Sequence, residues 1–186
     1  MDRRIHITGA SGSGVSTLGR ALAGELASQA FDTDDFYWVP TDPPFTEKRL
    51  VAERIALMEQ VFLPRGDWIL SGSLHTWGGP IMERVTHVIF LTLPASARLA
   101  RLRARERTRY GARIAPGGDR AESFRAFLDW AMSYDEGDEG PSRRREAHEA
   151  WLETLVCPVI RLTADVEPDA LVTQALTALD EVDHAA

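Results

Sequence analysis

The stretch RIHITGASGSGVST, residues 4–17, decides the fold of this chain. It opens with a short apolar run from Arg4 to Thr8, which is typical of a buried strand. Glycines follow at three positions of the next six, where a tight turn is expected because glycine adopts backbone conformations that other residues avoid. Leucines then recur at four-residue spacing and share one face of a helix: Leu18, Leu22 and Leu26. Strand, glycine-rich turn and helix in this order indicate the start of a βαβ unit.

The same alternation continues along the chain and predicts an α/β fold with a five-stranded parallel sheet. The expected strands are Arg4 to Thr8, Ala30 to Thr33, Trp68 to Ser71, His87 to Leu93 and Pro158 to Thr163. Further helical faces are formed by Val51, Ile55, Met58 and Phe62; by Leu99 and Leu102; by Phe124, Phe127, Leu128 and Ala131; by His148, Trp151, Leu152 and Leu155; and by Leu171, Ala175, Leu179 and Val182. Gly111 to Asp119 and Asp135 to Pro141 interrupt these helices and are expected to be loops.

Length and composition favour one intracellular domain over residues 1–186. The 186 residues are 44% hydrophobic and 26% charged, which is ordinary globular usage. The apolar runs are of strand length, so no membrane partner is expected, and the N-terminus lacks the pattern of a secretory leader. Cys157 is the only cysteine, which excludes an intrachain disulfide, and a cytoplasmic location is expected. The net charge of −7 argues against nucleic acid as the main partner.

The glycine-rich turn, Gly9 to Thr17, fits the phosphate-loop pattern G-x-x-x-x-G-K-[ST] at every position except Val15, where lysine is usual. Glycines let backbone N–H groups turn toward an anion, and the following helix points its positive end at the same place. Ser16 is placed to offer its hydroxyl to a phosphate-bound Mg²⁺. A plain glycine-rich turn before a helix is the alternative. The expected phosphate-binding residues are Gly9, Ser11, Gly12, Ser13, Gly14, Val15, Ser16 and Thr17.

An acidic turn, Asp32-Thr33-Asp34-Asp35, follows the second expected strand. Phosphoryl transfer needs a carboxylate near Mg²⁺ and often a second one that accepts the proton of the acceptor. The three aspartates are close enough in sequence to supply both, although a solvated surface turn has the same composition.

These two motifs resemble those of the shikimate kinase and gluconate kinase branch of the P-loop kinases. The sequence Asp-Asp-Phe-Tyr, residues 34–37, is also similar to the corresponding motif of uridine and nicotinamide riboside kinases. The overall order of the expected elements is similar to that of adenylate kinase. The resemblance implies a three-layer P-loop kinase fold with a helical, arginine-rich lid, and ATP and Mg²⁺ as cofactors. By the first comparison Asp32 serves Mg²⁺ and Asp34 is the base, which is the preferred choice. By the second, Asp35 is the base.

The resemblance also implies an acceptor-binding segment at about residues 36–66. Arg49 and Arg54 could bind a phosphate of the acceptor, or could form the solvated face of a helix. Gly72 leaves the third strand where such kinases bring backbone close to the acceptor, although a simple strand exit looks the same. His75 and Trp77 could line the pocket. The residues expected to contact the acceptor are Asp34, Tyr37, Trp38, Arg49, Arg54 and Gly72.

Basic residues are unevenly distributed, because Lys48 is the only lysine and twelve of the twenty arginines fall between Arg98 and Arg145. The resemblance places a lid at about residues 103–141, where arginines close over the transferred phosphoryl group. Arg101, Arg105 and Arg109 share one helical face. Arg105 and Arg109 are the preferred replacements for the absent lysine, with Arg143, Arg144 and Arg145 in reserve. A helix solubilised by charge, with Glu106 as a local partner, is the alternative. The resemblance also implies that the segment Thr163 to Pro168, with Asp165, lies beside the adenine, although a helix-capping turn is the alternative.

The sequence therefore predicts a phosphotransferase that moves the γ-phosphoryl group of ATP to a small-molecule acceptor, either a nucleoside or nucleotide or a polyhydroxylated metabolite. Each unusual feature follows the carboxyl end of an expected strand, where open parallel sheets bind ligands. A nucleotide-binding regulatory protein that has lost catalysis with its lysine, and an NTPase, are the alternatives. A monomer or a homodimer fits the sequence equally well.

Overall fold

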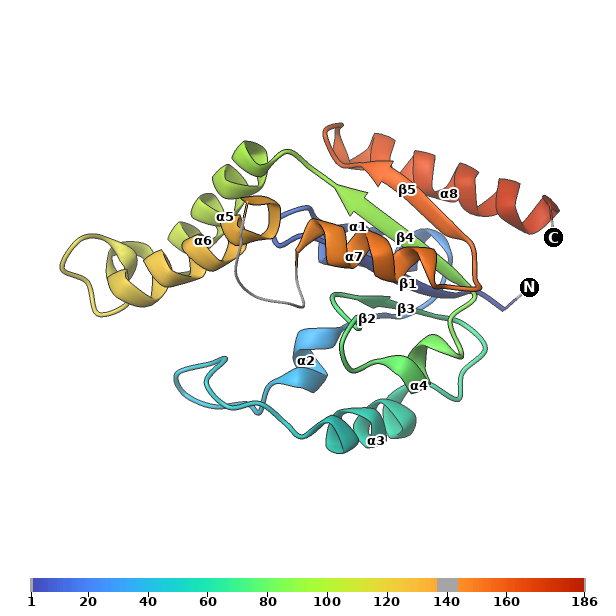
Figure 1. Cartoon of the computed structure of the whole chain (residues 1–186), viewed down its shortest axis with the longest axis horizontal. Coiled ribbons are helices and arrows are strands. Elements are labelled where there is room, and N and C mark those ends of the chain that lie inside the picture. Colours follow the sequence, from blue (N-terminus) through green and yellow to red (C-terminus); the bar gives the residue numbers. More distant parts are fainter. Residues whose placement is uncertain (1, 137–143, 186) are drawn as a thin grey trace.

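The computed structural model describes residues 2–136 and 144–185 and contains one five-stranded parallel sheet with the order β2-β3-β1-β4-β5. The strands are β1 (Arg4–Gly9), β2 (Ala30–Asp32), β3 (Trp68–Ser71), β4 (His87–Thr92) and β5 (Val159–Thr163). The predicted α/β class and the parallel five-stranded sheet are confirmed. β1 lies in the centre, so the turn that follows it emerges in the middle of one sheet edge (Figure 1).

The helices connect the strands and cover both faces of the sheet (Figure 1). They are α1 (Val15–Glu25), α2 (Thr33–Tyr37), α3 (Val51–Val61), α4 (Gly79–Met82), α5 (Ala95–Tyr110), α6 (Ala121–Glu136), α7 (Arg145–Glu153) and α8 (Pro168–Ala185), with a 3₁₀ turn at Gly111–Ile114. α5 and α6 extend from the carboxyl edge of the sheet, on the left in Figure 1, and α2 lies below them.

The core is divided by the sheet into two layers. On one side Ile5 and Ile7 of β1 pack with α1 and α8, and on the other side strand residues such as Leu70 and Phe90 pack with α3, α4 and α7. Both faces of a parallel sheet are buried in this way, which is why its strands read as nearly continuous apolar runs. The predicted helical face of α1 is confirmed, since Leu18 and Leu22 are buried in the first layer.

Three details of the expected elements are wrong. Thr33 was expected in the second strand but begins α2, because the Asp32 carboxylate accepts a hydrogen bond from the Asp34 N–H and caps a new helix there. Val51 was expected on the buried face of α3 but is 43% exposed, and Arg54 is buried in the first turn instead. The rings of Tyr37 in α2 and of Trp77, which follows β3, both stack on the Arg54 guanidinium, so the first turn of α3 directs Arg54 inward. The expected loop from Asp135 to Pro141 begins later, because Asp135 and Glu136 still belong to α6, and residues 137–141 lie outside the described residues. The expected loop from Gly111 to Asp119 includes the 3₁₀ turn.

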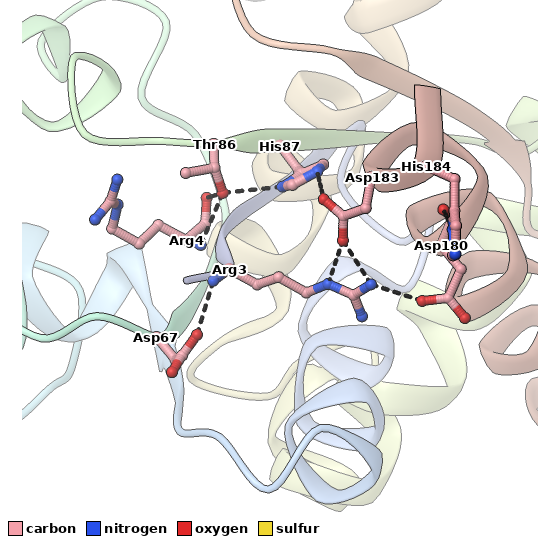
Figure 2. A network of polar contacts seen from close by, with 8 residues as sticks. All are labelled: Arg3, Arg4, Asp67, Thr86, His87, Asp180, Asp183 and His184. Carbon is pink, nitrogen blue, oxygen red and sulfur yellow. Dashed lines mark hydrogen bonds and ion pairs between the residues drawn. The ribbon is translucent and has the colours of Figure 1, made fainter. Parts of the chain in front are cut away.

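A network of hydrogen bonds and ion pairs lies at the amino edge of the sheet, opposite the carboxyl edge that bears the phosphate loop (Figure 2). Arg3 Nε donates to Asp183 Oδ2 across 2.8 Å, and the other oxygen of Asp183 lies 3.2 Å from His87 Nε2. The hydrogen bond from Arg3 keeps the pKa of Asp183 below its ordinary value, and burial lowers the pKa of His87. This network anchors α8 to the first residues of the chain and to β4.

No helix in the described part of the chain combines the length and the apolar character that a membrane span requires.

Candidate functional site

The phosphate loop leaves β1 at Gly9 and enters α1 at Val15. Gly12 and Gly14 have φ values of +85° and +102°, which only glycine adopts without strain. A Cβ on Gly9 would stand 2.5 Å from the Leu91 carbonyl oxygen, so this turn also passes close to β4. The loop geometry therefore depends on three glycines for two different reasons, backbone conformation and space.

Val15 occupies the position of the usual lysine and directs its side chain toward the core. It packs against the apolar cluster under α1, and its carbonyl oxygen accepts a hydrogen bond from Ser71 Oγ across 3.2 Å. Position 15 thus contributes packing and no positive charge.

Ser16 joins the phosphate loop to the acidic turn. Its Oγ donates to Asp32 Oδ2 across 2.5 Å, while Asp32 Oδ1 accepts from the Asp34 backbone N–H across 3.0 Å. A hydroxyl and a carboxylate oxygen are suitable Mg²⁺ ligands, and Mg²⁺ in nucleotide enzymes is held by one or two such groups together with phosphate and water oxygens. No cluster of three or more histidine, cysteine, aspartate or glutamate residues suited to a metal occurs among the described residues. The residues present fit Mg²⁺ that arrives with phosphate.

Asp34 and Asp35 lie in the first turn of α2, and solvent reaches both side chains. Partial burial, and then the charge of Asp32, raises the pKa of Asp35, while Arg20 of α1 opposes the rise. A raised pKa makes a carboxylate a stronger base, so the structure gives Asp35 an electrostatic property suited to that role. The choice between the two carboxylates remains a prediction.

On the acceptor side Arg54 is buried between aromatic rings. It is 6% exposed, its guanidinium carbon lies 3.8 Å from the centroid of the Tyr37 ring and 5.1 Å from that of Trp77, and its Nε donates to the Arg49 carbonyl across 2.8 Å. Among the described residues, no carboxylate forms an ion pair with it. Arg54 is therefore a buried cation held by stacking and not part of a solvated face.

Arg49 has a different position from Arg54. Its Nη1 donates to the carbonyl oxygens of Asp35 and Phe36, both at 3.3 Å, and also to that of Trp38. These carbonyls end α2, so Arg49 closes the helix that bears the two candidate bases.

The segment after α2 forms an arm that returns at Lys48, which pairs with Trp38 in an antiparallel bridge. Phe45 stands at its tip, is 46% exposed and lies 6.0 Å from the ring of Trp38. The guanidinium of Arg109, at the end of α5, lies 5.9 Å from the Phe45 ring. The arm and the expected lid thus approach each other. The sequence analysis missed Phe45, although an aromatic residue after two prolines was a usable signal.

Gly72 brings the end of β3 against α2. Its φ is +122°, and a Cβ there would stand 1.9 Å from Thr33 Oγ1. The Ser73 N–H donates to the same hydroxyl across 3.2 Å. The close approach at Gly72 is therefore to the start of the acidic helix.

The arginines of α5 have distinct partners. Arg105 pairs with Glu106 at 2.9 Å and lies near Phe127. Arg98 and Arg101, one turn apart at the start of the helix, contact the phosphate loop: Arg98 Nη1 donates to the Ser11 carbonyl across 3.0 Å, and Arg101 Nη1 to the Ser13 carbonyl across 3.4 Å.

The expected reserve arginines and the expected adenine contact come from segments that follow α5 in the chain. Arg145 pairs with Asp135 of α6 at 3.4 Å, Arg144 precedes α7, and Arg143 lies outside the described residues. Asp165 is exposed and follows Ala164, whose carbonyl oxygen accepts a hydrogen bond from Arg101 Nη2 across 3.0 Å.

Behind the phosphate loop lies a polar cluster that the sequence analysis did not anticipate. Thr8 Oγ1 is hydrogen-bonded to His148 Nε2 across 3.1 Å, and His148 Nδ1 to the Tyr134 hydroxyl across 3.1 Å. Burial raises the pKa of Tyr134 to about 12. The His75 ring is nearly parallel to that of His148, with centroids 6.2 Å apart. This cluster connects β1 to α6 and α7.

No protein-family model matches the chain. The uncharacterized protein YqaC of Bacillus subtilis (strain 168) is 40% identical over 179 residues, covering 96% of this chain and 98% of YqaC. The chain belongs to the YqaC family.

The fold of this YqaC-family chain is similar to those of several solved structures. Shikimate kinase from Aquifex aeolicus matches with a TM-score of 0.55 and 14% identity, over 98% of this chain and 99% of that one. Shikimate kinase from Bacteroides thetaiotaomicron matches with a TM-score of 0.53 and 18% identity, over 96% and 98%. A gluconokinase from Sinorhizobium meliloti 1021 matches with a TM-score of 0.51 and 16% identity, over 97% and 93%. The expected P-loop kinase fold is confirmed.

Proposed function

We propose that the chain is an ATP- and Mg²⁺-dependent phosphotransferase that acts on a small-molecule acceptor. The observation that carries this proposal is the 2.5 Å hydrogen bond between Ser16 of the phosphate loop and Asp32 of the acidic turn. Two sequence motifs with separate roles in phosphoryl transfer meet there, at the carboxyl edge of a parallel sheet, which is where this architecture binds ligands. The P-loop kinase fold supports the same reading.

The proposed roles on the nucleotide side follow from this contact. The loop from Gly9 to Thr17 presents backbone N–H groups and the start of α1 to the phosphates. Ser16 and Asp32 would hold Mg²⁺, which when bound neutralises the charge on the phosphates. Asp165, beside Ala164, would lie near the base of the nucleotide.

On the acceptor side a carboxylate of α2 takes the proton. The acceptor oxygen attacks the γ-phosphorus, its proton passes to Asp34 or Asp35, a new P–O bond forms, and the bond to the β-phosphate oxygen breaks to release ADP. Gly72 supports this arrangement by letting β3 lie against the first turn of α2.

The acceptor is proposed to carry an anionic group, which fits a phosphorylated or carboxylated metabolite as well as a nucleotide. Arg54 supports this class, because it is a buried cation whose fork can contact two oxygens of a phosphate or carboxylate. Its neighbours Tyr37 and Trp77 offer flat apolar surface to the rest of the molecule. Arg105 and Arg109 remain the proposed arginines of the lid.

Phosphorus NMR on the purified protein with ATP and Mg²⁺ tests the proposal. Four acceptor pools are supplied separately: nucleoside monophosphates, nucleosides, neutral polyols, and small phosphorylated or carboxylated metabolites. Transfer to an anionic pool supports the proposal. ATP binding without transfer to any pool would point to a nucleotide-binding regulator, and release of phosphate without an acceptor would point to an NTPase.

The acceptor class is tested further with Arg54→Gln, once an accepting pool is found. We expect the KM for the acceptor to rise about 10- to 100-fold while the KM for ATP stays within about twofold, because the lost contacts are charge-assisted and confined to the acceptor. Arg65→Gln, on an exposed arginine after α3, is the matched control. An unchanged acceptor KM in Arg54→Gln would exclude this arginine as the anion-binding group.

A further inference from the structure

The outer side of the phosphate loop is contacted by two arginines from far along the chain. Arg98 Nη1 donates to the carbonyl oxygen of Ser11 across 3.0 Å, and Arg101 Nη1 to that of Ser13 across 3.4 Å. Both arginines belong to the first turns of α5. They contact the peptide groups that follow Ser11 and Ser13, in a loop that has Val15 where the phosphate-loop pattern usually has lysine.

The direction of these contacts matters because the peptide units of the loop are trans. In a trans peptide the C=O and the N–H point in opposite directions. When the Ser11 and Ser13 carbonyls point outward to the arginines, the N–H groups of Gly12 and Gly14 point to the other side, into the loop. The positive φ values of both glycines permit this orientation.

Arg98 is the more firmly held of the two. It is 1% exposed, pairs with the Asp135 carboxylate of α6, and its Nη1 also donates to the Ala131 carbonyl across 3.4 Å. The loop lies directly on its helix, since a Cβ on Gly12 would stand 2.9 Å from the Arg98 carbonyl oxygen. Asp135 is shared with Arg145, so two cations and one anion stand together behind the loop.

Arg101 bridges two loops at the carboxyl edge of the sheet. Besides the Ser13 carbonyl it contacts the Ala164 carbonyl, after β5, across 3.0 Å. Within the described residues it forms no ion pair with a carboxylate. Its Nη1 lies 3.6 Å from the place that a Cβ on Gly14 would take. An uncompensated positive charge therefore stands beside the last residue of the loop.

We propose that Arg98 and Arg101 supply, through the loop backbone, the phosphate affinity that a lysine at position 15 would supply directly. A hydrogen bond from a cation to a carbonyl polarises the peptide and strengthens the N–H on its far side as a donor. Arg98 thereby acts on the Gly12 N–H and Arg101 on the Gly14 N–H, and both are positioning residues. This inference rests on the proposed function, because it requires the loop to bind the phosphates of a nucleotide.

The experiment measures binding rather than turnover. Isothermal titration calorimetry compares Mg²⁺·ATP, tripolyphosphate and adenosine on the whole chain for wild type, Arg101→Gln and Arg101→Lys. Arg103→Gln, on an exposed arginine of the same helix for which the described residues show no contact with the phosphate loop, is the matched control. We expect Arg101→Gln to weaken ATP and tripolyphosphate about tenfold, Arg101→Lys to recover most of the loss, and adenosine binding to stay unchanged.

Val15→Lys in the Arg101→Gln background gives an independent check. If the arginines substitute for the lysine, restoring the lysine recovers tripolyphosphate binding. Arg98→Lys is expected to fold and to lower the affinity for tripolyphosphate as well. If Arg98→Lys does not fold, the inference is tested by the Arg101 variants alone.

The outcomes separate this inference from the proposed function. Wild type that binds neither ATP nor tripolyphosphate overturns both. Wild type that binds ATP, together with Arg101→Gln that matches the Arg103→Gln control, overturns only the role of Arg101. A loss confined to adenosine would place Arg101 on the base of the nucleotide and would also overturn the inference.

Discussion

The hydroxyl of Ser16 donates to the carboxylate of Asp32 across 2.5 Å, and thereby connects the first helix to the end of the second strand. The other Asp32 oxygen caps α2. One side chain thus orders the acidic helix and stands beside the phosphate loop, so the residue proposed for Mg²⁺ also positions the residues proposed as the base.

Asp32→Asn separates these two roles. Asparagine is as good an N-cap as aspartate, so we expect the free energy of unfolding to change by less than about 1 kcal/mol. The lost charge is expected to lower kcat/KM about 100- to 1000-fold and to raise the Mg²⁺ concentration needed for half-maximal rate. Asp67→Asn, at the amino edge of the sheet, is the control. Wild-type Mg²⁺ dependence in Asp32→Asn would remove this residue from the metal site.

Asp34→Asn is expected to abolish transfer while the Kd for ATP stays within about twofold, because the base touches the acceptor and not the nucleotide. Asp35→Asn is the matched variant one residue away. If transfer survives in Asp34→Asn and is lost in Asp35→Asn, the base is Asp35.

The pH profile provides a second criterion for the base. A general base acts when deprotonated, so kcat/KM falls as the pH drops through its pKa. Burial and the charge of Asp32 raise the pKa of Asp35. If Asp35 is the base, the acid limb lies above the ordinary aspartate range and moves when Asp32 is changed to Asn.

Gly72→Ala is expected to cost about 2–4 kcal/mol of the free energy of unfolding, measured by urea titration. The new Cβ would stand 1.9 Å from Thr33 Oγ1, at a φ of +122°. Gly24→Ala is the control, because a Cβ at this position of α1 has no neighbour within 4 Å. It is expected to stabilise the protein by up to about 1 kcal/mol. Equal effects of the two substitutions would contradict the close approach of β3 to α2.

His6 makes the stability of the protein depend on pH. It is fully buried on β1, and burial lowers its pKa to about 4, although its hydrogen bond to the Leu70 carbonyl opposes the shift. The folded state therefore binds a proton at His6 more weakly than the unfolded state does. The contribution of neutral His6 to the free energy of unfolding is fully present above about pH 6.5 and is lost as the pH falls toward 4.

Between pH 7 and pH 5 this residue is expected to account for a loss of about 2 kcal/mol. His6→Leu should reduce the difference between the two pH values by about that amount, as measured by guanidinium titration at both. The same pH dependence in His6→Leu and wild type would show that another group is responsible.

Much of the fold was predictable because its signals are local. The side chains from Arg4 to Thr8 alternate between the two faces of the sheet. The glycines that follow mark the turn, and the leucines after them mark one face of α1. The strand Trp68–Ser71 has the predicted bounds. The sequence also placed Ser16 and Asp32 at the same edge of the sheet, since the carboxyl ends of all parallel strands lie at one edge, although β3 lies between β1 and β2.

The contacts of side chains between distant segments were not predictable in the same way. Arg54 has the sequence surroundings of a solvated helix residue, and it is buried because the Tyr37 and Trp77 rings stack around it. Thr33 begins a helix because Asp32 caps it. A helix of about one turn is too short to show a repeating hydrophobic pattern in the sequence.

The sequence by itself determined that a strand, a lysine-free phosphate loop and an arginine-rich helix occur in this protein, because periodicity and glycine spacing act over a few residues. Only the tertiary structure decided which arginines touch the loop. Arg101, Arg105 and Arg109 share one face, but each turn of α5 carries the next about 6 Å farther along the axis. The packing of α5 against residues almost ninety positions earlier brings its first turns, with Arg98 and Arg101, within hydrogen-bonding distance of the loop.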